Sequence, residues 1–127
     1  MIKEAVICVI IVTFIFGLEI FTQNFTKETV SQMTGTLTSL KDAMSQKDNE
    51  KIKKDLEDLT NKWEERHNKL AYYIEHNELE KVETAIVRMK SYIESEKFED
   101  AITELEDGKF VLEHIQDKNS FNLQNIF

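Results

Sequence analysis

Residues 5–21 read AVICVIIVTFIFGLEIF, and Glu19 is the one charged residue in this run. Seventeen helical residues span about 25 Å at 1.5 Å per residue, slightly short of a hydrocarbon core of roughly 30 Å. The side chains of Lys3 and Glu19 lie close enough to the two ends to reach the head groups. We therefore predict a transmembrane anchor at residues 1–22, held in membrane lipid through residues 5–21.

A cleaved signal peptide and a buried core helix are the two alternatives to an anchor at this start. A cleaved signal peptide also has a charged start and an apolar core, but residues 17–23 (GLEIFTQ) contain no small-x-small cleavage site. A buried core helix would need its apolar surface covered on every side. Lys3 precedes the run, and the first basic residue beyond it is Lys27. This asymmetry favours a single-pass protein of the cell membrane with a cytoplasmic amino terminus and an extracytoplasmic C-terminal domain.

The rest of the chain is acidic. Residues 22–127 hold 15 basic and 22 acidic residues, a net charge of −7. This balance argues against nucleic-acid binding, which needs a basic surface, and against electrostatic docking on anionic lipid. The only cysteine, Cys8, lies within the apolar run, so the polar part can form no disulfide and no thiolate metal site. This cysteine usage is ordinary for a bacterial extracytoplasmic domain.

Helical periodicity dominates the polar part, and the chain contains no proline. Apolar residues at spacings 3-4-3-4 predict an amphipathic helix over about 27–46, and residues 22–24 are a polar joint where this helix either breaks or continues from the anchor. A turn follows at 46–49, with Asp48 as N-cap. The second helix is expected to run to about residue 75.

Two further helices complete the pattern. Asn77 with Glu80 three positions on resembles a capping box for the third helix, and Ser95 can cap the fourth. Residues 81–86 (KVETAI) and 97–102 (KFEDAI) open alike, sixteen residues apart, which predicts an antiparallel helical hairpin. The fold class is therefore all-α: an N-terminal transmembrane helix followed, at 23–118, by an antiparallel bundle of about four helices.

The end of the chain differs again, because residues 119–127 carry no charged side chain. Exposed apolar residues of this size are costly in water without a partner, so this uncharged apolar tail either packs back on the bundle or docks onto another molecule. Together with Glu19, an ionisable residue at the edge of the span, the tail supplies the candidate partner-docking residues. These are Glu19, Phe121, Leu123, Ile126 and Phe127.

No catalytic arrangement is visible. Glu64 and His67 form one Glu-x-x-His pair, whereas di-iron bundles use two such pairs, and neither His76 nor His114 has a glutamate three positions before it. We therefore expect no enzyme activity, no metal and no cofactor. Trp63, His67 and Tyr73 are candidates for lining a small ligand pocket between helices, although aromatic residues at helical spacing are more often core.

One resemblance covers nearly the whole chain. It rests on Trp63, the run YIEHNELE at 73–80, the pattern AIxxL at 101–105, His114-Ile115 and the final NIF at 125–127. These features resemble an uncharacterised Firmicute family, the domain of unknown function 4363. The resemblance implies a short amino-terminal membrane segment, a helical body and a bacterial membrane location, and it supplies no catalytic residues.

These observations predict a membrane-tethered extracytoplasmic interaction or accessory protein without catalysis, whose partner is another membrane protein. The alternative is a ligand-sensing four-helix bundle that signals through a membrane partner. The 3-4 stripes of the first two helices would also serve an intermolecular coiled coil, so a homo-oligomer stays open.

Overall fold

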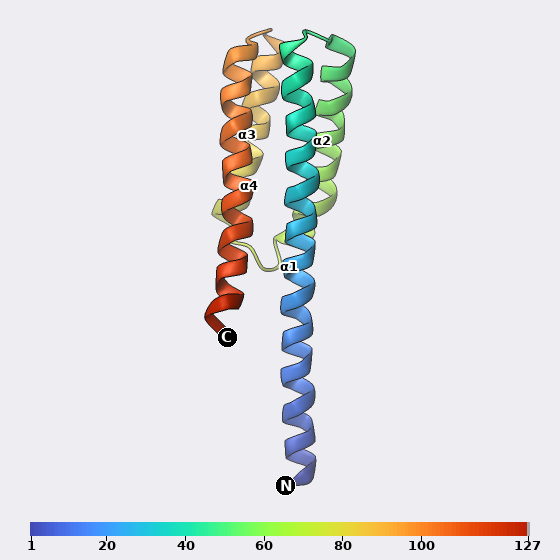
Figure 1. Ribbon diagram of the computed structural model, residues 1–127, viewed down its shortest axis with the longest axis vertical. Helices are drawn as coiled ribbons and strands as arrows, with labels where there is room; N and C mark the ends of the chain where they lie inside the picture. The colour runs from blue at the N-terminus through green and yellow to red at the C-terminus, as the bar shows by residue number, and fades with distance from the viewer. Residues whose placement is uncertain (127) are drawn as a thin grey trace.

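The computed structural model describes the backbone of residues 1–126 and the side chains of residues 1–119. It contains four helices in this part of the chain, and it confirms the all-α prediction. They are α1 (Ile2–Ser45), α2 (Asn49–Leu70), α3 (His76–Glu94) and α4 (Phe98–Ile126). Successive helices run antiparallel, and the first half of α1 extends well beyond the others (Figure 1).

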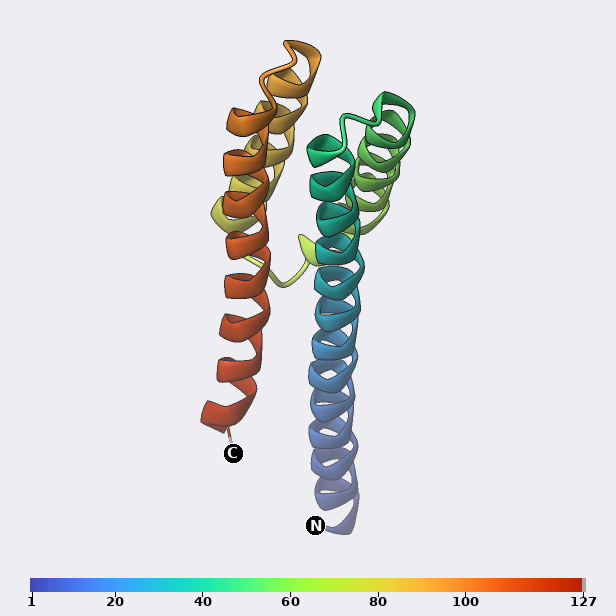
Figure 2. The same cartoon turned by 45° about the horizontal axis from the view of Figure 1, so that its top comes forward.

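The bundle consists of two helical hairpins. One is α1 with α2 and the other is α3 with α4, which confirms the hairpin predicted from the repeated opening of the last two helices. The hairpins meet mainly through α1 and α4, whereas α2 and α3 make little contact with each other. Figure 2 shows the two hairpins side by side, joined by the α2–α3 loop.

The longest element is α1, an unbroken helix of 44 residues. The polar joint at residues 22–24 continues the helix, so the apolar run and the first amphipathic helix form one rod about 66 Å long at 1.5 Å per residue. The first buried residue along this rod is Thr26. The two halves of α1 therefore have different surroundings: the second half packs in the bundle and the first stands outside it.

The core follows the predicted stripes. Side chains at 3-4 spacing on each helix pack into one cluster, as ridges of facing helices interdigitate. Its largest fully buried apolar side chains are Met33, Leu40, Met44, Leu59, Leu79, Val82, Met89, Leu105 and Leu112. Trp63 belongs to the same cluster and is 5% exposed.

The two tight turns at the far end of the bundle share one geometry. After α1, the backbone N–H of Asp48 donates to the carbonyl of Ala43 at 3.0 Å, with Lys47 at φ 55°. After α3, the N–H of Lys97 donates to the carbonyl of Tyr92 at 2.8 Å, with Glu96 at φ 58°. Both are Schellman motifs, although neither has the glycine that usually occupies the left-handed position.

Helix capping is only partly as predicted. Asp48 caps α2, because its carboxylate accepts from the Lys51 N–H at 3.3 Å. The Ser95 prediction is wrong: Ser95 is the C-cap of α3, since the Schellman turn occupies residues 95–97 before α4 begins.

The α2–α3 connection also differs from the prediction. Helix α2 ends at Leu70 and not near residue 75, because the chain must cross here from one hairpin to the other. Asn77 is not a cap, since the N-cap is Glu75, whose carbonyl accepts from the Leu79 N–H at 3.3 Å without any side-chain cap bond. The first turn of α3 therefore starts earlier than the capping-box pattern indicated.

A polar seam runs along the α1–α2 contact. The Ser39 hydroxyl donates to Asp55 at 2.7 Å, and Lys62 Nζ donates to Thr36 at 3.0 Å and to Asp58 at 2.9 Å. These bonds satisfy hydroxyls that the Thr/Ser-rich side of α1 brings into the bundle. They fix the register of α1 against α2 in addition to the apolar contacts.

Candidate functional site

The first candidate feature is the free half of α1. It belongs to the one helix among the described residues that is long and apolar enough to cross a membrane, and none of its most apolar window is buried in the protein. Large apolar side chains project from it on all sides, Val6, Phe14 and Phe21 among them, and Cys8 is exposed. Helical residues 2–21 span about 30 Å, which equals a typical hydrocarbon thickness.

Where the free half of α1 meets the bundle, a polar network joins three elements. The Tyr73 hydroxyl of the α2–α3 loop lies 2.7 Å from Thr26 Oγ1 and donates to the Thr22 carbonyl at 3.2 Å. From α4, Asn119 Nδ2 donates to Thr26 Oγ1 at 3.4 Å, and the Asn119 carbonyl accepts from Gln23 Nε2 at 3.3 Å. Thr26 is 1% exposed, and this network forms a partly buried polar junction between the free half of α1 and the bundle.

Burial changes the chemistry of the tyrosine in this junction. Desolvation raises the pKa of Tyr73 above its usual value, and the hydrogen bond from Thr26 opposes this only in part. The phenol is therefore neutral at physiological pH, as its bond to the Thr22 carbonyl requires.

Two cationic side chains of α2 lie over the ring of Phe25, which is next to Thr26 in α1. The guanidinium of Arg66 lies 5.3 Å from the centre of the Phe25 ring, and Lys69 Nζ lies 5.7 Å from it. Arg66 also donates to Thr29 at 2.9 Å. Phe25 stacks on Phe21 with ring centres 6.4 Å apart, which connects the bundle to the last turn of the apolar run in α1.

The residues predicted for a ligand pocket do not line one common cavity. Trp63 is buried in the core and contacts His67 edge-on at 5.4 Å. Tyr73 lines a cavity of about 100 Å³ with residues of the loop, α3 and α4, and that cavity includes neither Trp63 nor His67. The junction residues Thr26 and Asn119 were missed; the 3-4 spacing of α1 extends back from Val30 to Thr26 and could have indicated burial there.

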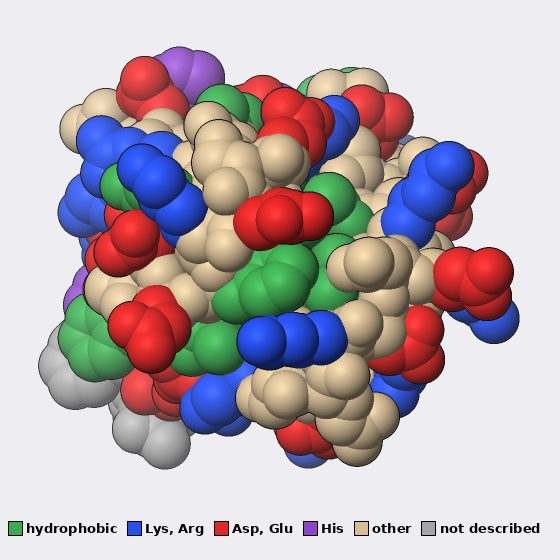
Figure 3. All heavy atoms as spheres, turned by 90° about the horizontal axis from the view of Figure 1, so that it is seen from above, with side chains coloured by type: hydrophobic (Ala, Val, Ile, Leu, Met, Phe, Trp, Pro, Cys, Tyr) green, Lys and Arg blue, Asp and Glu red, His purple; other side chains and the backbone are tan. Residues whose placement is uncertain are grey.

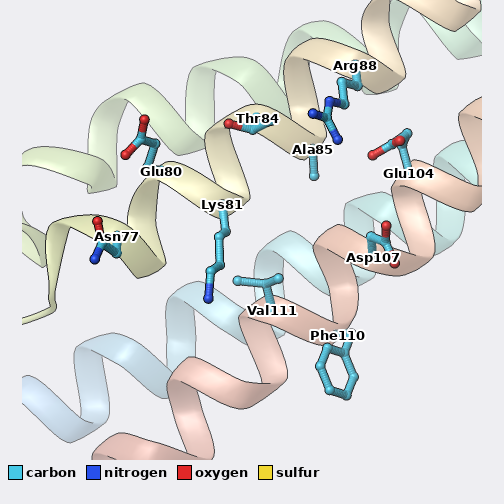
Figure 4. Close-up of a pocket in the computed structure, with 10 residues that line it drawn as sticks. All are labelled: Asn77, Glu80, Lys81, Thr84, Ala85, Arg88, Glu104, Asp107, Phe110 and Val111. Carbon is cyan, nitrogen blue, oxygen red and sulfur yellow. The ribbon is translucent and has the colours of Figure 1, made fainter.

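A second surface feature is an open groove of about 500 Å³ on the outside of the α3–α4 hairpin. Residues of both helices line it, with charges of both signs, and Figure 4 shows Lys81 extending from α3 toward α4 near Val111. Phe110 projects from α4 and is 70% exposed. The full lining is Asn77, Glu80, Lys81, Thr84, Ala85, Arg88, Glu104, Asp107, Phe110 and Val111.

The two helices approach each other closely beside this groove. At Gly108 an added Cβ would lie 3.3 Å from the Cβ of Ala85, so α3 and α4 approach closely here. Small residues permit such an approach, and the longer side chains on either side then form the walls. We refer to the surface lined by the ten residues above as the α3–α4 groove.

Glu19 and the C-terminal tail contain the candidate partner-docking residues. Glu19 is partly buried on α1, and the Thr22 hydroxyl donates to its backbone carbonyl at 3.0 Å. The side chains of Phe121, Leu123, Ile126 and Phe127 lie outside the described residues. Within the described part of the chain, no group of three or more His, Cys, Asp or Glu side chains is arranged to hold a metal ion.

These features define a class of protein: a helical bundle continuous with one candidate membrane-spanning helix. The particular family follows from the sequence, since residues 20–126 match the domain of unknown function (DUF4363). The chain therefore belongs to this family, as the resemblance in its second half indicated. No curated protein and no solved structure matches it.

Proposed function

We propose that this protein is a membrane-tethered accessory protein whose extracytoplasmic bundle binds another membrane protein and performs no catalysis. The observation that carries the proposal is the continuity of α1. Its first half is apolar and uncovered, and its second half supplies core residues of the bundle without a break in the helix. A rod of this kind fixes the height and the direction of the bundle above a membrane, which a flexible linker would not do.

The α3–α4 groove supports the choice of a protein partner. It is open and carries acidic and basic side chains beside an exposed phenylalanine. Aromatic side chains with a charged surround are typical of protein interfaces. The alternative, a ligand-sensing bundle, would be better supported by a closed cavity beside Trp63, where the core is packed.

Site-specific photo-crosslinking in native membranes tests the partner. A photoreactive residue at Phe110 is expected to give a discrete adduct with a membrane protein. The matched control is Val87, which is also exposed on the α3–α4 hairpin but does not line the groove. Equal adducts at both positions, or none at Phe110 and at its groove neighbours Lys81 and Glu104, would contradict docking through the groove.

A parallel truncation tests the tail. Removing residues 120–127 changes the set of captured partners if the tail takes part in docking, and leaves it unchanged if the groove alone does so.

The orientation of the bundle relative to the membrane is measured with Lys47→Cys in the far turn, in a Cys8→Ser background. A membrane-impermeant maleimide is expected to label it in intact cells; labelling only after lysis would place the bundle in the cytoplasm.

A further inference from the structure

The two ends of the bundle differ in chemistry. The turns at the far end contain the charged runs QKDNE at 46–50 and ESEK at 94–97, and Figure 3 shows charged side chains around a hydrophobic centre at that end. The connection at the near end, between α2 and α3, begins LAYYI at 70–74 and has no charge before Glu75. Leu70, Tyr73 and Ile74 pack on the bundle, so the exposed part of this loop is Ala71 and Tyr72, with no charged side chain between Lys69 and Glu75.

The hydrogen bonds place this loop at the height of the end of the span. The Tyr73 hydroxyl donates to the carbonyl of Thr22, the residue directly after the apolar run. Tyr72, which directly precedes Tyr73 in the chain, is 90% exposed. The loop lies beside the middle of α1, on the side of the bundle that faces the free half of that helix (Figure 1).

Charges on α4 end at the same height. Asn119 hydrogen-bonds Gln23 and Thr26 of α1, and Lys118 is the last charged residue in the sequence. The backbone of α4 continues as a helix to Ile126, toward the N-terminal end of α1. Beyond this level the sequence of α4 has no charged side chain, and α1 has only Glu19 before Glu4 and Lys3 near its start. Such depletion is what contact with a bilayer interface requires, since charged groups are costly below it.

From this coincidence we infer that the α2–α3 loop is seated in the interface of the bilayer that α1 spans, with the exposed Tyr72 side chain among the lipid head groups. Tyrosine suits this position because its ring is apolar and its hydroxyl finds polar partners at head-group depth. The occupant of this surface is lipid, because the loop lies directly beside the emerging span. The inference rests on the membrane placement in the proposed function.

Such seating has a mechanical consequence. One helix through a membrane leaves its attached domain free to tilt, whereas a second contact beside the span restricts that tilt. The buried Tyr73–Thr26 bond fixes the loop to α1, so Tyr72 and the span act as two points of attachment to the same bilayer. The α3–α4 groove is then presented at a constant height and angle.

Spin-label accessibility on the full chain in phosphatidylcholine vesicles tests the inference. One nitroxide is placed by Tyr72→Cys in a Cys8→Ser background, and its collisions with oxygen, which concentrates in the bilayer, are compared with those of a water-soluble nickel chelate. The matched control is Phe110→Cys, another exposed aromatic position, nine residues above Asn119 along α4. The native Cys8, labelled in the otherwise unchanged protein, reports on the span itself.

At position 72 the oxygen-to-nickel ratio is expected to lie between the high value at Cys8 and the low value at position 110. A position-72 ratio equal to that at 110, with Cys8 still protected from nickel, would overturn the seating of the loop and leave the anchor intact. A low ratio at Cys8 would overturn the proposed membrane placement itself. Equally high ratios at 72 and 110 would mean that the bundle lies flat on the membrane, which also refutes the upright seating. Fluorescence of Trp63, which is buried in the core, verifies folding of each variant.

Discussion

The junction between the free half of α1 and the bundle can be tested by a double-mutant cycle at Thr26 and Tyr73. The two side-chain oxygens lie 2.7 Å apart. Thr26→Val keeps the shape of a side chain that is 1% exposed but removes the hydroxyl that also accepts from Asn119. Tyr73 then keeps only the Thr22 carbonyl, and Asn119 Nδ2 loses its bond to Thr26. Loss of hydrogen-bond partners costs about 1–3 kcal/mol, and we expect Thr26→Val to lower the free energy of unfolding by an amount at the lower end of this range.

The second single variant should cost less. Tyr73→Phe removes one hydroxyl, but Thr26 keeps its contact with Asn119 and the Thr22 carbonyl keeps its place in the α1 helix. Its expected cost is about 1 kcal/mol, the net value of an ordinary hydrogen bond. The double variant lacks both hydroxyls, so the tyrosine hydroxyl that Thr26→Val deprives of a partner is absent from it. The combined loss of stability should therefore be smaller than the sum of the two single losses by about 0.5–1 kcal/mol.

Urea unfolding of the full chain in detergent micelles measures these values. Trp63 is the single tryptophan and is 5% exposed, so its fluorescence reports the bundle and not the span. Circular dichroism provides a second probe, whose midpoint must coincide with that of fluorescence for the two-state treatment to hold. Thr26→Ser, which keeps the hydroxyl, is the matched control and should retain the coupling. Additivity of the two single losses within about 0.3 kcal/mol would refute the reasoning.

Three further predictions use the same assay. Lys47→Gly should stabilise the bundle by up to about 1 kcal/mol, because glycine has no steric penalty at φ 55°. Its control, Gln46→Gly, lies at φ −87° and should destabilise the bundle. The opposite order of the two stabilities would contradict the Schellman assignment. Leu59→Ala should lower the free energy of unfolding by about 2–5 kcal/mol, because Leu59 is fully buried. Val87→Ala, at an exposed site, should change this free energy by less than about 0.5 kcal/mol. Equal losses of stability in the two variants would refute the core assignment. The raised pKa of folded Tyr73 means that its contribution is complete below the unfolded value of 10.0 and is lost as pH rises through the higher folded value. Wild type should therefore lose more stability than Tyr73→Phe in urea titrations at increasingly alkaline pH, and parallel losses would exclude this origin.

Local patterns were sufficient for much of the fold. The stripe from Val30 to Met44 repeats every three or four residues, and such a helix buries one face whatever its neighbours are. Asp48 caps α2 because a cap bond spans only three residues and depends little on distant contacts. The capping predictions at Asn77 and Ser95 failed for the opposite reason: there the chain path is set by the crossing between hairpins and by a Schellman turn.

The candidate site was less accessible to sequence reasoning. Thr26, Tyr73 and Asn119 are far apart in the chain and meet only because α1, the α2–α3 loop and α4 are packed at one height. The α3–α4 groove likewise needs two helices to pack side by side, and the close approach of Gly108 to Ala85 next to it is something that no periodicity reports. By contrast, Trp63 and His67 share one helix, and their contact follows from a spacing of four residues.

The apolar run, the acidic charge of the remaining residues and the helical periods can be read directly from the amino-acid order, because they depend on composition and on contacts within a few residues. Tertiary structure alone decided that residues 22–24 continue the helix, since polar residues at a joint are compatible with either outcome until packing selects one. It also decided that the loop at 70–74 and the last charged residue of α4 lie beside the point on α1 where its free half ends. That alignment requires the register between helices, which is set by side chains interlocking across the core.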